Sequence, residues 1–309
     1  MTEEQGQEMK ILITGGAGFI GSHLLERCIK EGHVVLCLDN LVNNNSINVR
    51  HLHDYHNCKL IKGDIRDSAL LEMIMRDVNV VFHLAAYLPN DKSMYNPFLC
   101  FDINERGTLN LLKTAYLNGV NTFIYSSTMK VYSEPAAYLP VDEQHPVQPS
   151  TIYGVSKLAS ELYCGVYSKA MNMIILRYSR VYGEGVTKCK PITTFISQAL
   201  SNSPLTIYGD GTQSSDFVYV SDVVQANLQA LEKNKPGIYN IGSGEEVSIR
   251  DLAERIISIT GSKSDTVMLE KKIDEPLRFV LDITKSRKAL GYSPLSLNEG
   301  LSRIIKIHV

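Results

Sequence analysis

Tyr153 and Lys157, four residues apart, are the residues of this chain whose types and spacing best suit proton transfer. On a helix this spacing places both side chains on one face. A free tyrosine has a pKa of about 10, and a neighbouring ammonium group favours its phenolate form. We therefore expect Lys157 to lower the pKa of Tyr153 and so to make the phenol a general base.

Three hydroxyl side chains, Ser126, Ser127 and Thr128, precede this pair at the end of an apolar run. Ligands of an open α/β sheet gather at the carboxyl ends of its strands. We expect Thr128 to hydrogen-bond the substrate and Ser126 to lie at the cofactor. A Tyr-x-x-x-Lys pair alone occurs by chance in many chains, so its specificity depends on the segments that come before it.

A glycine-rich segment near the N-terminus reads Thr-Gly-Gly-Ala-Gly-Phe-Ile-Gly from Thr14, between an apolar run and an amphipathic stretch. Gly15 would permit a tight turn and Gly18 a close approach of the backbone to a pyrophosphate, while Gly21 would let a helix pack closely on a strand. The phosphates would face the N-terminus of that helix. This pattern predicts a bound dinucleotide.

The next apolar run ends at Asp39, 18 residues after Gly21. A carboxylate there can accept hydrogen bonds from an adenosine ribose. It would also repel a 2′-phosphate, and the following segment, Asn40 to Asn45, contains no arginine to neutralise one. We therefore predict NAD rather than NADP as the cofactor.

Length, charge and apolar pattern narrow the class of protein. The chain has 309 residues and a formal net charge of −2, which allows one large or two closely packed domains. Its first ten residues are polar and acidic, and no block of Lys and Arg exceeds two residues. We expect a cytoplasmic enzyme that binds neither nucleic acid nor a membrane.

Cysteines and histidines do not predict a metal site. The six cysteines are scattered without a Cys-x-x-Cys pair, and we interpret them as reduced packing residues. His51, His53 and His56 lie in a polar stretch without an acid or thiol partner at a metal-binding spacing. We interpret them as solvated side chains.

Apolar runs typical of strands alternate with helix-like patterns over the first two thirds of the chain. The strands are expected at residues 10–14, 34–38, 59–62, 80–83, 122–126, 174–178 and 238–241. The clearest helix-like patterns cover residues 69–76, 108–118 and 153–170. This alternation predicts an α/β fold with a Rossmann-like, doubly wound parallel sheet.

Glycine and proline interrupt shorter segments after residue 178, which indicates a smaller α/β substrate-binding region. We place a dinucleotide-binding domain at residues 1–178, with residues 216–241 returning to it. The substrate-binding region is placed at residues 179–215 and 242–309.

Several motifs occur together in a set order: the glycine-rich segment, Gly63-Asp64-Ile65-Arg66-Asp67, His83-Leu84-Ala85-Ala86, Ser126-Ser127-Thr128, Tyr153 with Lys157, and Tyr208-Gly209-Asp210-Gly211. In these motifs the chain resembles, over nearly its whole length, the extended short-chain dehydrogenases/reductases that act on nucleotide sugars. The resemblance implies catalysis by Thr128, Tyr153 and Lys157. It also implies that Asp64 and Ile65 hold adenine, and that Ala85 and Ala86 line the cofactor. The full expected cofactor-binding set is Gly15, Gly18, Phe19, Ile20, Gly21, Asp39, Asn40, Asp64, Ile65, Ala85, Ala86, Ser126, Tyr153, Lys157 and Tyr178.

The resemblance further implies a homodimer built on a four-helix interface. The helices concerned would be Phe98–Asn118 and Tyr153–Ala170. Their apolar residues could equally belong to the core of a single chain.

Two positions after the active-site threonine depart from the pattern of the family's dehydratases, which usually carry an acidic pair there. Met129 and Lys130 stand at these positions. Elimination of water therefore lacks its acid and base, and 4,6-dehydration is not expected. The Thr-x-Lys-Val-Tyr segment resembles some CDP-sugar enzymes, including a 2-epimerase, although Lys130 could also be a solvated side chain.

Two further departures concern the sugar diphosphate. Arg180 stands where the family commonly has Asn, and Ser215 stands where it often has Arg. A guanidinium group binds a diphosphate through paired hydrogen bonds, so Arg180 and Arg278 could supply the clamp. The alternative is a surface ion pair between Arg180 and Glu184. The expected substrate-binding set is Tyr87, Thr128, Lys130, Arg180 and Arg278.

The sequence thus predicts an NAD-dependent nucleotide-sugar epimerase that acts through a transient ketosugar, with C4 the commonest reacting carbon in the family. A nucleotide-sugar 4-dehydrogenase or a 4-ketosugar reductase would use the same residues and remains an alternative. A catalytically inactive dinucleotide-binding regulator is a third reading, against which the intact Thr128, Tyr153 and Lys157 argue. The sequence does not specify the nucleobase or the sugar.

Overall fold

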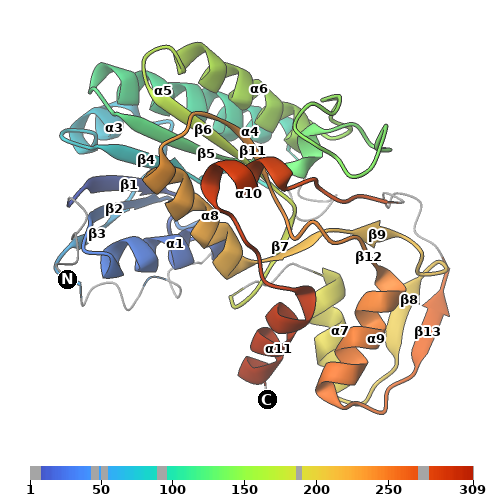
Figure 1. The fold of residues 1–309 in the computed structure, drawn as a ribbon. Coiled ribbons are helices and arrows are strands. Elements are labelled where there is room, and N and C mark those ends of the chain that lie inside the picture. The colour runs from blue at the N-terminus through green and yellow to red at the C-terminus, as the bar shows by residue number, and fades with distance from the viewer. Residues whose placement is uncertain are drawn as a thin grey trace. The chain divides into compact units, whose positions relative to one another are not determined.

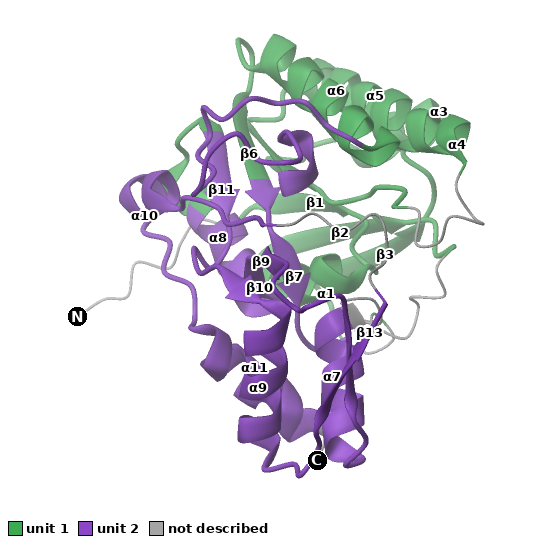
Figure 2. Ribbon diagram, turned by 90° about the vertical axis from the view of Figure 1, so that its right-hand side faces the viewer, with its two compact units in different colours: residues 1–127, 151–176, 230–237 green, residues 128–150, 177–229, 238–309 purple. Residues whose placement is uncertain are grey.

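The computed structural model describes residues 8–42, 49, 55–88, 96–185, 190–270 and 278–308 (Figure 1). His51, His53 and Cys189 lie outside these ranges. The chain divides into two compact units, drawn in different colours in Figure 2. Unit 1 contains residues 1–127, 151–176 and 230–237, and unit 2 contains residues 128–150, 177–229 and 238–309.

The main sheet contains all seven strands that the sequence predicted. Their bounds are β1 (Lys10–Thr14), β2 (Val34–Asp39), β3 (Cys58–Lys62), β4 (Val80–His83), β5 (Thr122–Thr128), β6 (Asn172–Tyr178) and β11 (Gly237–Ile241). The strand order is β11-β6-β5-β4-β1-β2-β3, and β1 pairs in parallel with both β2 and β4. The predicted Rossmann-like doubly wound sheet is confirmed.

The strand order reverses beside β1, and this reversal positions the cofactor loop. From β1 the chain builds outward through β2 and β3, and it then returns to place β4 on the other side of β1. The last residues of the two neighbours, Thr14 and His83, stand opposite each other in register. Ligands of doubly wound sheets bind at the carboxyl ends of the strands at such a switch point.

The helices of unit 1 lie on both faces of the sheet. Their bounds are α1 (Phe19–Lys30), α3 (Ser68–Ile74), α4 (Pro97–Cys100), α5 (Thr108–Leu117) and α6 (Ile152–Tyr167), with a π-helix, η3 (Phe101–Gly107), between α4 and α5. Figure 1 shows α3 to α6 on one face and α1 on the other. Helix α6 begins where the Thr151 hydroxyl accepts a hydrogen bond from the Gly154 backbone N–H at 3.0 Å.

Unit 2 combines short strands with longer helices. Its elements are η4 (Met129–Val131), β7 (Arg180–Tyr182), α7 (Lys190–Leu200), β8 (Leu205–Tyr208), β9 (Ser214–Ser215), β10 (Phe217–Tyr219), α8 (Val220–Lys233), β12 (Val247–Ser248), α9 (Ile249–Thr260), β13 (Thr266–Leu269), α10 (Thr284–Leu290) and α11 (Leu297–His308). The strands pair as β10 with β7, β12 with β9 and β13 with β8. Apolar side chains of α7, α9 and α11 share one buried cluster.

A fully buried carboxylate, Asp216, joins three separate segments of unit 2. It accepts hydrogen bonds from the Ser179 hydroxyl and from both the N–H and the hydroxyl of Ser243. The backbone N–H groups of Gly244 and Leu281 donate to its other oxygen. Burial raises the pKa of Asp216, and these donors oppose the rise because they favour the ionised form.

The two compact units differ from the two functional regions placed on the sequence. Residues 128–150 group with unit 2 although the dinucleotide-binding domain was placed at residues 1–178. Of residues 216–241, only 230–237 group with unit 1. The assignment of cofactor and substrate to the two functional regions stays a proposal.

Candidate active site

The glycine-rich loop packs so closely that two of its positions exclude a side chain. Gly15 has a φ of +70°, and a Cβ there would stand 2.7 Å from the backbone nitrogen of Ala85. A Cβ at Gly21 would stand 2.2 Å from the Gly15 carbonyl oxygen. Gly18 is the N-cap of α1, and the first-turn N–H groups of a helix have no partners within the helix. The loop therefore has the shape and the free donors that a pyrophosphate requires.

Asp39 is held at the carboxyl end of β2 by two backbone N–H groups. Ala17, in the glycine-rich loop, donates to its Oδ2 at 3.1 Å, and Leu41 donates to its Oδ1 at 2.8 Å. The carboxylate is thereby tied to the loop that precedes α1. Each oxygen keeps a second lone pair, as a ribose contact would require.

Asp64, expected near adenine, is already engaged by a cation. Arg66 binds its two oxygens through Nε and Nη2 at 2.9 and 2.8 Å, and also contacts Asp102. These hydrogen bonds hold the pKa of Asp64 below its ordinary value. The Asn40 side chain also hydrogen-bonds Asp64, and Ile65 is buried. An adenine contact by Asp64 would therefore use an acceptor that Arg66 leaves open.

A buried imidazole, His83, joins the ends of β1 and β4 to the start of α5. Its Nδ1 lies 2.7 Å from the Thr14 hydroxyl, and its Nε2 lies 2.8 Å from the Thr108 hydroxyl. Thr108 donates to the Asn104 carbonyl, so it must accept from Nε2–H. Burial holds the pKa of His83 well below its ordinary value. His83 is therefore neutral and protonated on Nε2.

Asn104, in the π-helix η3, was not singled out from the sequence. Its Oδ1 accepts from the Tyr87 N–H at 2.7 Å, and its Nδ2 donates to the Tyr87 carbonyl at 3.0 Å. The same Nδ2 lies 2.9 Å from the Ser156 hydroxyl on α6. Asn104 thus links the loop after β4 to the helix that carries Tyr153 and Lys157.

The predicted proton-transfer pair lies on α6, where Lys157 is buried and Tyr153 is partly buried. Lys157 is 2% exposed, and its Nζ lies 4.1 Å from the centre of the Tyr125 ring. Burial lowers the pKa of Lys157 to about 7. Burial also raises the pKa of Tyr153, with a smaller contribution from Cys100. This direction opposes our expectation for Tyr153, because desolvation favours the neutral phenol.

The three hydroxyl residues at the end of β5 differ in their contacts. Ser126 is 8% exposed, and Ser127 donates to the buried carboxylate of Glu161 on α6. The Thr128 hydroxyl oxygen accepts the Lys130 N–H at 3.2 Å as the N-cap of η4. This contact uses an acceptor site of the Thr128 hydroxyl and leaves its hydrogen uninvolved.

Lys130 and Arg278, both expected to contact substrate, have carboxylate partners within unit 2. The Lys130 Nζ lies 2.6 Å from Glu134 Oε1. Arg278 is 63% exposed and binds both oxygens of Glu246 at 2.6 and 2.7 Å. A substrate diphosphate would have to compete with Glu246 for Arg278.

Arg180 is the first residue of β7, which pairs with the strand that begins two residues after Ser215. Its N–H donates to the Asp216 carbonyl at 3.2 Å, because β7 and β10 pair in parallel. Among the described residues, its Nε is buried without a hydrogen-bond partner, and so is the Ser215 hydroxyl. Glu184, the alternative partner, accepts the Tyr219 hydroxyl at 2.7 Å.

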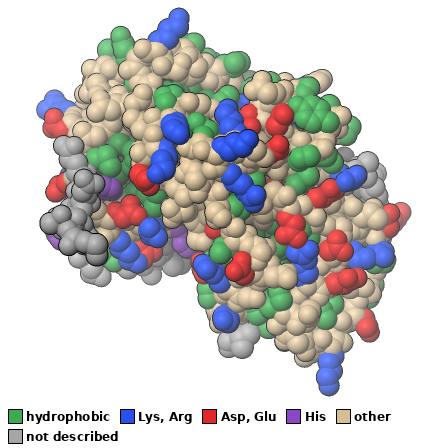
Figure 3. All heavy atoms as spheres, viewed as in Figure 1, with side chains coloured by type: hydrophobic (Ala, Val, Ile, Leu, Met, Phe, Trp, Pro, Cys, Tyr) green, Lys and Arg blue, Asp and Glu red, His purple; other side chains and the backbone are tan. Residues whose placement is uncertain are grey.

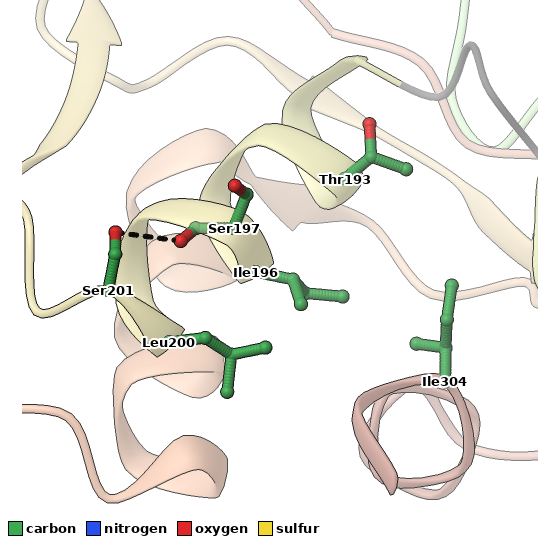
Figure 4. A pocket seen from close by; sticks show the side chains of 6 residues that line it. All are labelled: Thr193, Ile196, Ser197, Leu200, Ser201 and Ile304. Atoms are coloured by element: carbon green, nitrogen blue, oxygen red, sulfur yellow. Dashed lines mark hydrogen bonds between the residues drawn. The ribbon is translucent and has the colours of Figure 1, made fainter. Parts of the chain in front are cut away.

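Tyr178, expected at the cofactor, has a hydrogen-bond partner in unit 2. The Tyr178 hydroxyl lies 2.8 Å from the Asn227 side-chain nitrogen. A groove of about 390 Å³ lies in unit 2 on α7 and α11, and none of the predicted site residues lines it (Figure 4). Its lining residues are Thr193, Ile196, Ser197, Leu200, Ser201 and Ile304.

On the face drawn in Figure 3, acidic and basic side chains are interspersed. Within the described ranges, no helix is long and apolar enough to cross a bilayer. The same residues contain no group of three or more His, Cys, Asp or Glu side chains that could hold a metal ion.

A family model described as the NAD dependent epimerase/dehydratase family matches residues 11–242. The chain belongs to this family. It is 40% identical over 304 residues to a protein of Methanocaldococcus jannaschii that carries the provisional name UDP-glucose 4-epimerase, and the match covers 96% of this chain and 97% of that protein.

Two solved structures of epimerases resemble the fold over nearly its whole length. The UDP-glucose 4-epimerase of Thermotoga maritima, solved with UDP-glucose, has a TM-score of 0.88 and 33% identity, covering 97% of this chain and 98% of that one. The UDP-glucuronic acid 4-epimerase of Bacillus cereus, solved with UDP-glucuronic acid and NAD, has a TM-score of 0.87 and 35% identity, covering 96% and 98%.

We predict that Gly15→Ala weakens NAD binding at least about tenfold, because the new Cβ would push the loop away from Ala85 and strain a positive φ. Gly119→Ala is the matched control, since Gly119 has the same φ of +70° but its Cβ would meet no described atom within 4 Å. Calorimetric titration of both apo-proteins with NAD separates the clash from the backbone strain. Equal NAD affinities would contradict a cofactor role for the loop.

Proposed function

We propose that this protein is an NAD-dependent nucleotide-sugar 4-epimerase. The observation that carries the proposal is that one compact unit holds both the glycine loop, which excludes side chains at Gly15 and Gly21, and the Tyr153–Lys157 pair on α6. The similarity to three proteins named as 4-epimerases supports the reacting carbon. The substrate is a nucleoside-diphosphate sugar.

In this proposal the residues divide the chemistry as follows. Tyr153 accepts the proton of the sugar 4-hydroxyl and later returns it, while Lys157 stabilises the phenolate and Thr128 donates to the substrate oxygen. The glycine loop and Asp39 would hold NAD, whose chemistry would be reversible hydride transfer at the same carbon. Met129 and Lys130 provide no carboxylate pair for elimination of water. Since free cysteines are buried in the described core, a cytoplasmic location is part of the proposal.

The protonation state of Lys157 should determine how turnover changes as the pH rises above neutrality. With a pKa of about 7, Lys157 loses its proton as the pH rises through neutrality. A neutral amine no longer stabilises the phenolate, so turnover should fall on that side. The same residues would serve a nucleotide-sugar 4-dehydrogenase or 4-ketosugar reductase, which differ only in whether hydride returns to the same sugar.

We predict that the purified protein converts UDP-glucose, UDP-glucuronic acid or UDP-N-acetylglucosamine to its 4-epimer, and that Tyr153→Phe lowers turnover about 10²–10⁴-fold. Tyr163→Phe is the matched control, since Tyr163 is a partly exposed tyrosine on the same helix. Product is followed by NMR and NADH by absorbance. Stoichiometric NADH without epimer would favour the dehydrogenase, and equal turnover of both variants would remove Tyr153 from the mechanism.

Arg180 is proposed to bind the substrate diphosphate in place of the arginine that Ser215 replaces. The proximity of the β7 backbone to Asp216 and the buried, unpartnered Nε support this assignment. Arg180→Ala should weaken substrate binding by about 1.5–3 kcal/mol, the usual value for a hydrogen bond to a charged group, with NAD affinity unchanged. Lysine at position 180 should recover only part, because it lacks the planar fork.

Adding Ser215→Arg to the Arg180→Ala protein is the complementary test. Restored substrate affinity would show that the two positions reach the same phosphates. A KM for Arg180→Ala equal to that of the parent would instead assign Arg180 a role within the protein.

We further propose a homodimer through the helices at residues 98–118 and α6. Large apolar side chains are exposed on both, including Phe98 (82%), Leu117 (65%), Leu162 (67%) and Val166 (72%). These side chains stand on helices that pack against one another, and exposed apolar side chains that gather in one area typically mark a protein interface. The expected cytoplasmic environment gives such a surface no lipid to contact.

Leu162→Asp with Val166→Asp should convert the dimer to a monomer, because each places a charge in the proposed interface. Ile307→Asp is the control, since Ile307 is an exposed apolar residue on α11. Sedimentation equilibrium gives the mass of each variant. A parent protein with the mass of one chain would contradict the dimer.

A further inference from the structure

Glu161 is a buried carboxylate that the reaction as described does not use. It lies on α6 and is only 5% exposed. The Ser127 hydroxyl, at the end of β5, donates a hydrogen bond to its Oε1. Carboxylates are rarely buried to this extent unless a partner compensates for the lost water.

The position of Glu161 on α6 directs its charge toward Lys157. The two residues are four apart on the helix, so they share one face. Both are buried, at 5% and 2% exposure. Burial lowers the pKa of Lys157, and Cys164, Glu161 and Cys100 oppose that effect, Glu161 through the negative charge of its carboxylate.

Other titratable groups face Lys157 from the surrounding elements. They are Tyr125 on β5, His83 on β4, Cys100 on α4, and Tyr153 and Cys164 on α6. Burial keeps His83 neutral, and it raises the pKa of Tyr125 and of Cys164, so that both stay protonated near neutrality. Of the described groups whose charge acts on Lys157, Glu161 is the carboxylate.

We propose that Glu161 is a positioning residue, whose carboxylate maintains the ammonium form of Lys157 and ties the strand end at Ser127 to α6. The inference rests on the proposed function, since it assigns the catalytic lysine its charge. Ser127 is directly followed by Thr128, so one carboxylate serves both the charge of the lysine and the anchoring of the hydroxyl run.

The physical reason is that burial alone works against the lysine's role. Lys157 has a pKa of about 7 with the carboxylate present. Removing the negative charge would lower that pKa further, and most of Lys157 would then be a neutral amine at pH 7. The phenolate of Tyr153 would lose its nearest positive charge from the protein.

The direct test titrates Lys157 by NMR, without substrate, in protein labelled with ¹³C at the lysine Cε. Lys157→Met identifies the signal. Glu161→Gln should lower the pKa of Lys157 by about one unit, the lower end of the shift that a nearby opposite charge usually causes. Glu26→Gln removes an exposed helical carboxylate instead and should change nothing. A Lys157 pKa equal to the parent's in Glu161→Gln would overturn the proposal.

Glu161→Asp keeps the negative charge but holds it one methylene closer to the backbone. This variant provides the test if Glu161→Gln does not fold. Its Lys157 pKa should lie below that of the parent and, where Glu161→Gln folds, above that of Glu161→Gln. A value equal to the parent's, or one as low as in Glu161→Gln, would contradict a role through charge and distance.

The activity test uses the pH profile of kcat. Because the ammonium form is the active one, a lower Lys157 pKa should move the alkaline limb of Glu161→Gln about one unit toward acid, with KM nearly unchanged. An active epimerase whose alkaline limb stays in place would overturn the inference. If no nucleotide sugar is epimerised, the proposed function fails, while the NMR titration still decides the charge of Lys157.

Discussion

A single buried imidazole, His83, lies at the centre of the hydrogen bonds that connect the glycine-rich loop of unit 1 to α6, the helix of Tyr153 and Lys157. Thr14 donates to Nδ1 of His83, and Nε2–H of His83 donates to Thr108, which donates in turn to the Asn104 carbonyl. Each hydroxyl in this series of hydrogen bonds donates one and accepts another, so the direction of each bond fixes the direction of the next. A proton on Nδ1 would remove the acceptor that Thr14 needs. The imidazole therefore has to remain neutral for the arrangement to persist.

The two ends of this chain of hydrogen bonds reach the functional parts. At one end, the Thr14 hydroxyl oxygen receives the Ala85 N–H, and Ala85 is the residue against which Gly15 packs. At the other end, Asn104 holds the Tyr87 backbone and the Ser156 hydroxyl on α6. The loop that is to hold NAD and the helix that carries the reacting groups are thus parts of one polar network.

The strands and the reacting pair could be predicted because they depend on local patterns. Seven apolar runs became seven strands, since alternation with helices leaves few other arrangements. The shared face of Tyr153 and Lys157 follows from the helical period alone. The pKa of Tyr153 moved in the unexpected direction because burial is a property of the packed chain.

Contacts explain the other differences. Arg278 meets Glu246, 32 residues earlier, which no spacing rule indicates, whereas Lys130 meets Glu134 only four residues further along the chain. Asn104 lies in a π-helix, and its sequence resembles that of an ordinary helix. π-helical turns often occur at functional sites. An asparagine shortly before Gly107 and Thr108 is therefore the sequence feature that could indicate such a turn in other chains.

Asp216 gives unit 2 an organisation that resembles a metal centre with its signs reversed. A bound cation gathers oxygen atoms from separate loops, whereas here one anion gathers N–H and O–H donors from residues 179, 243–244 and 281. The connection is covalent on the side of the anion, so it cannot dissociate as an ion can. Unit 2 thus obtains the cross-linking effect of a structural metal without depending on the supply of one.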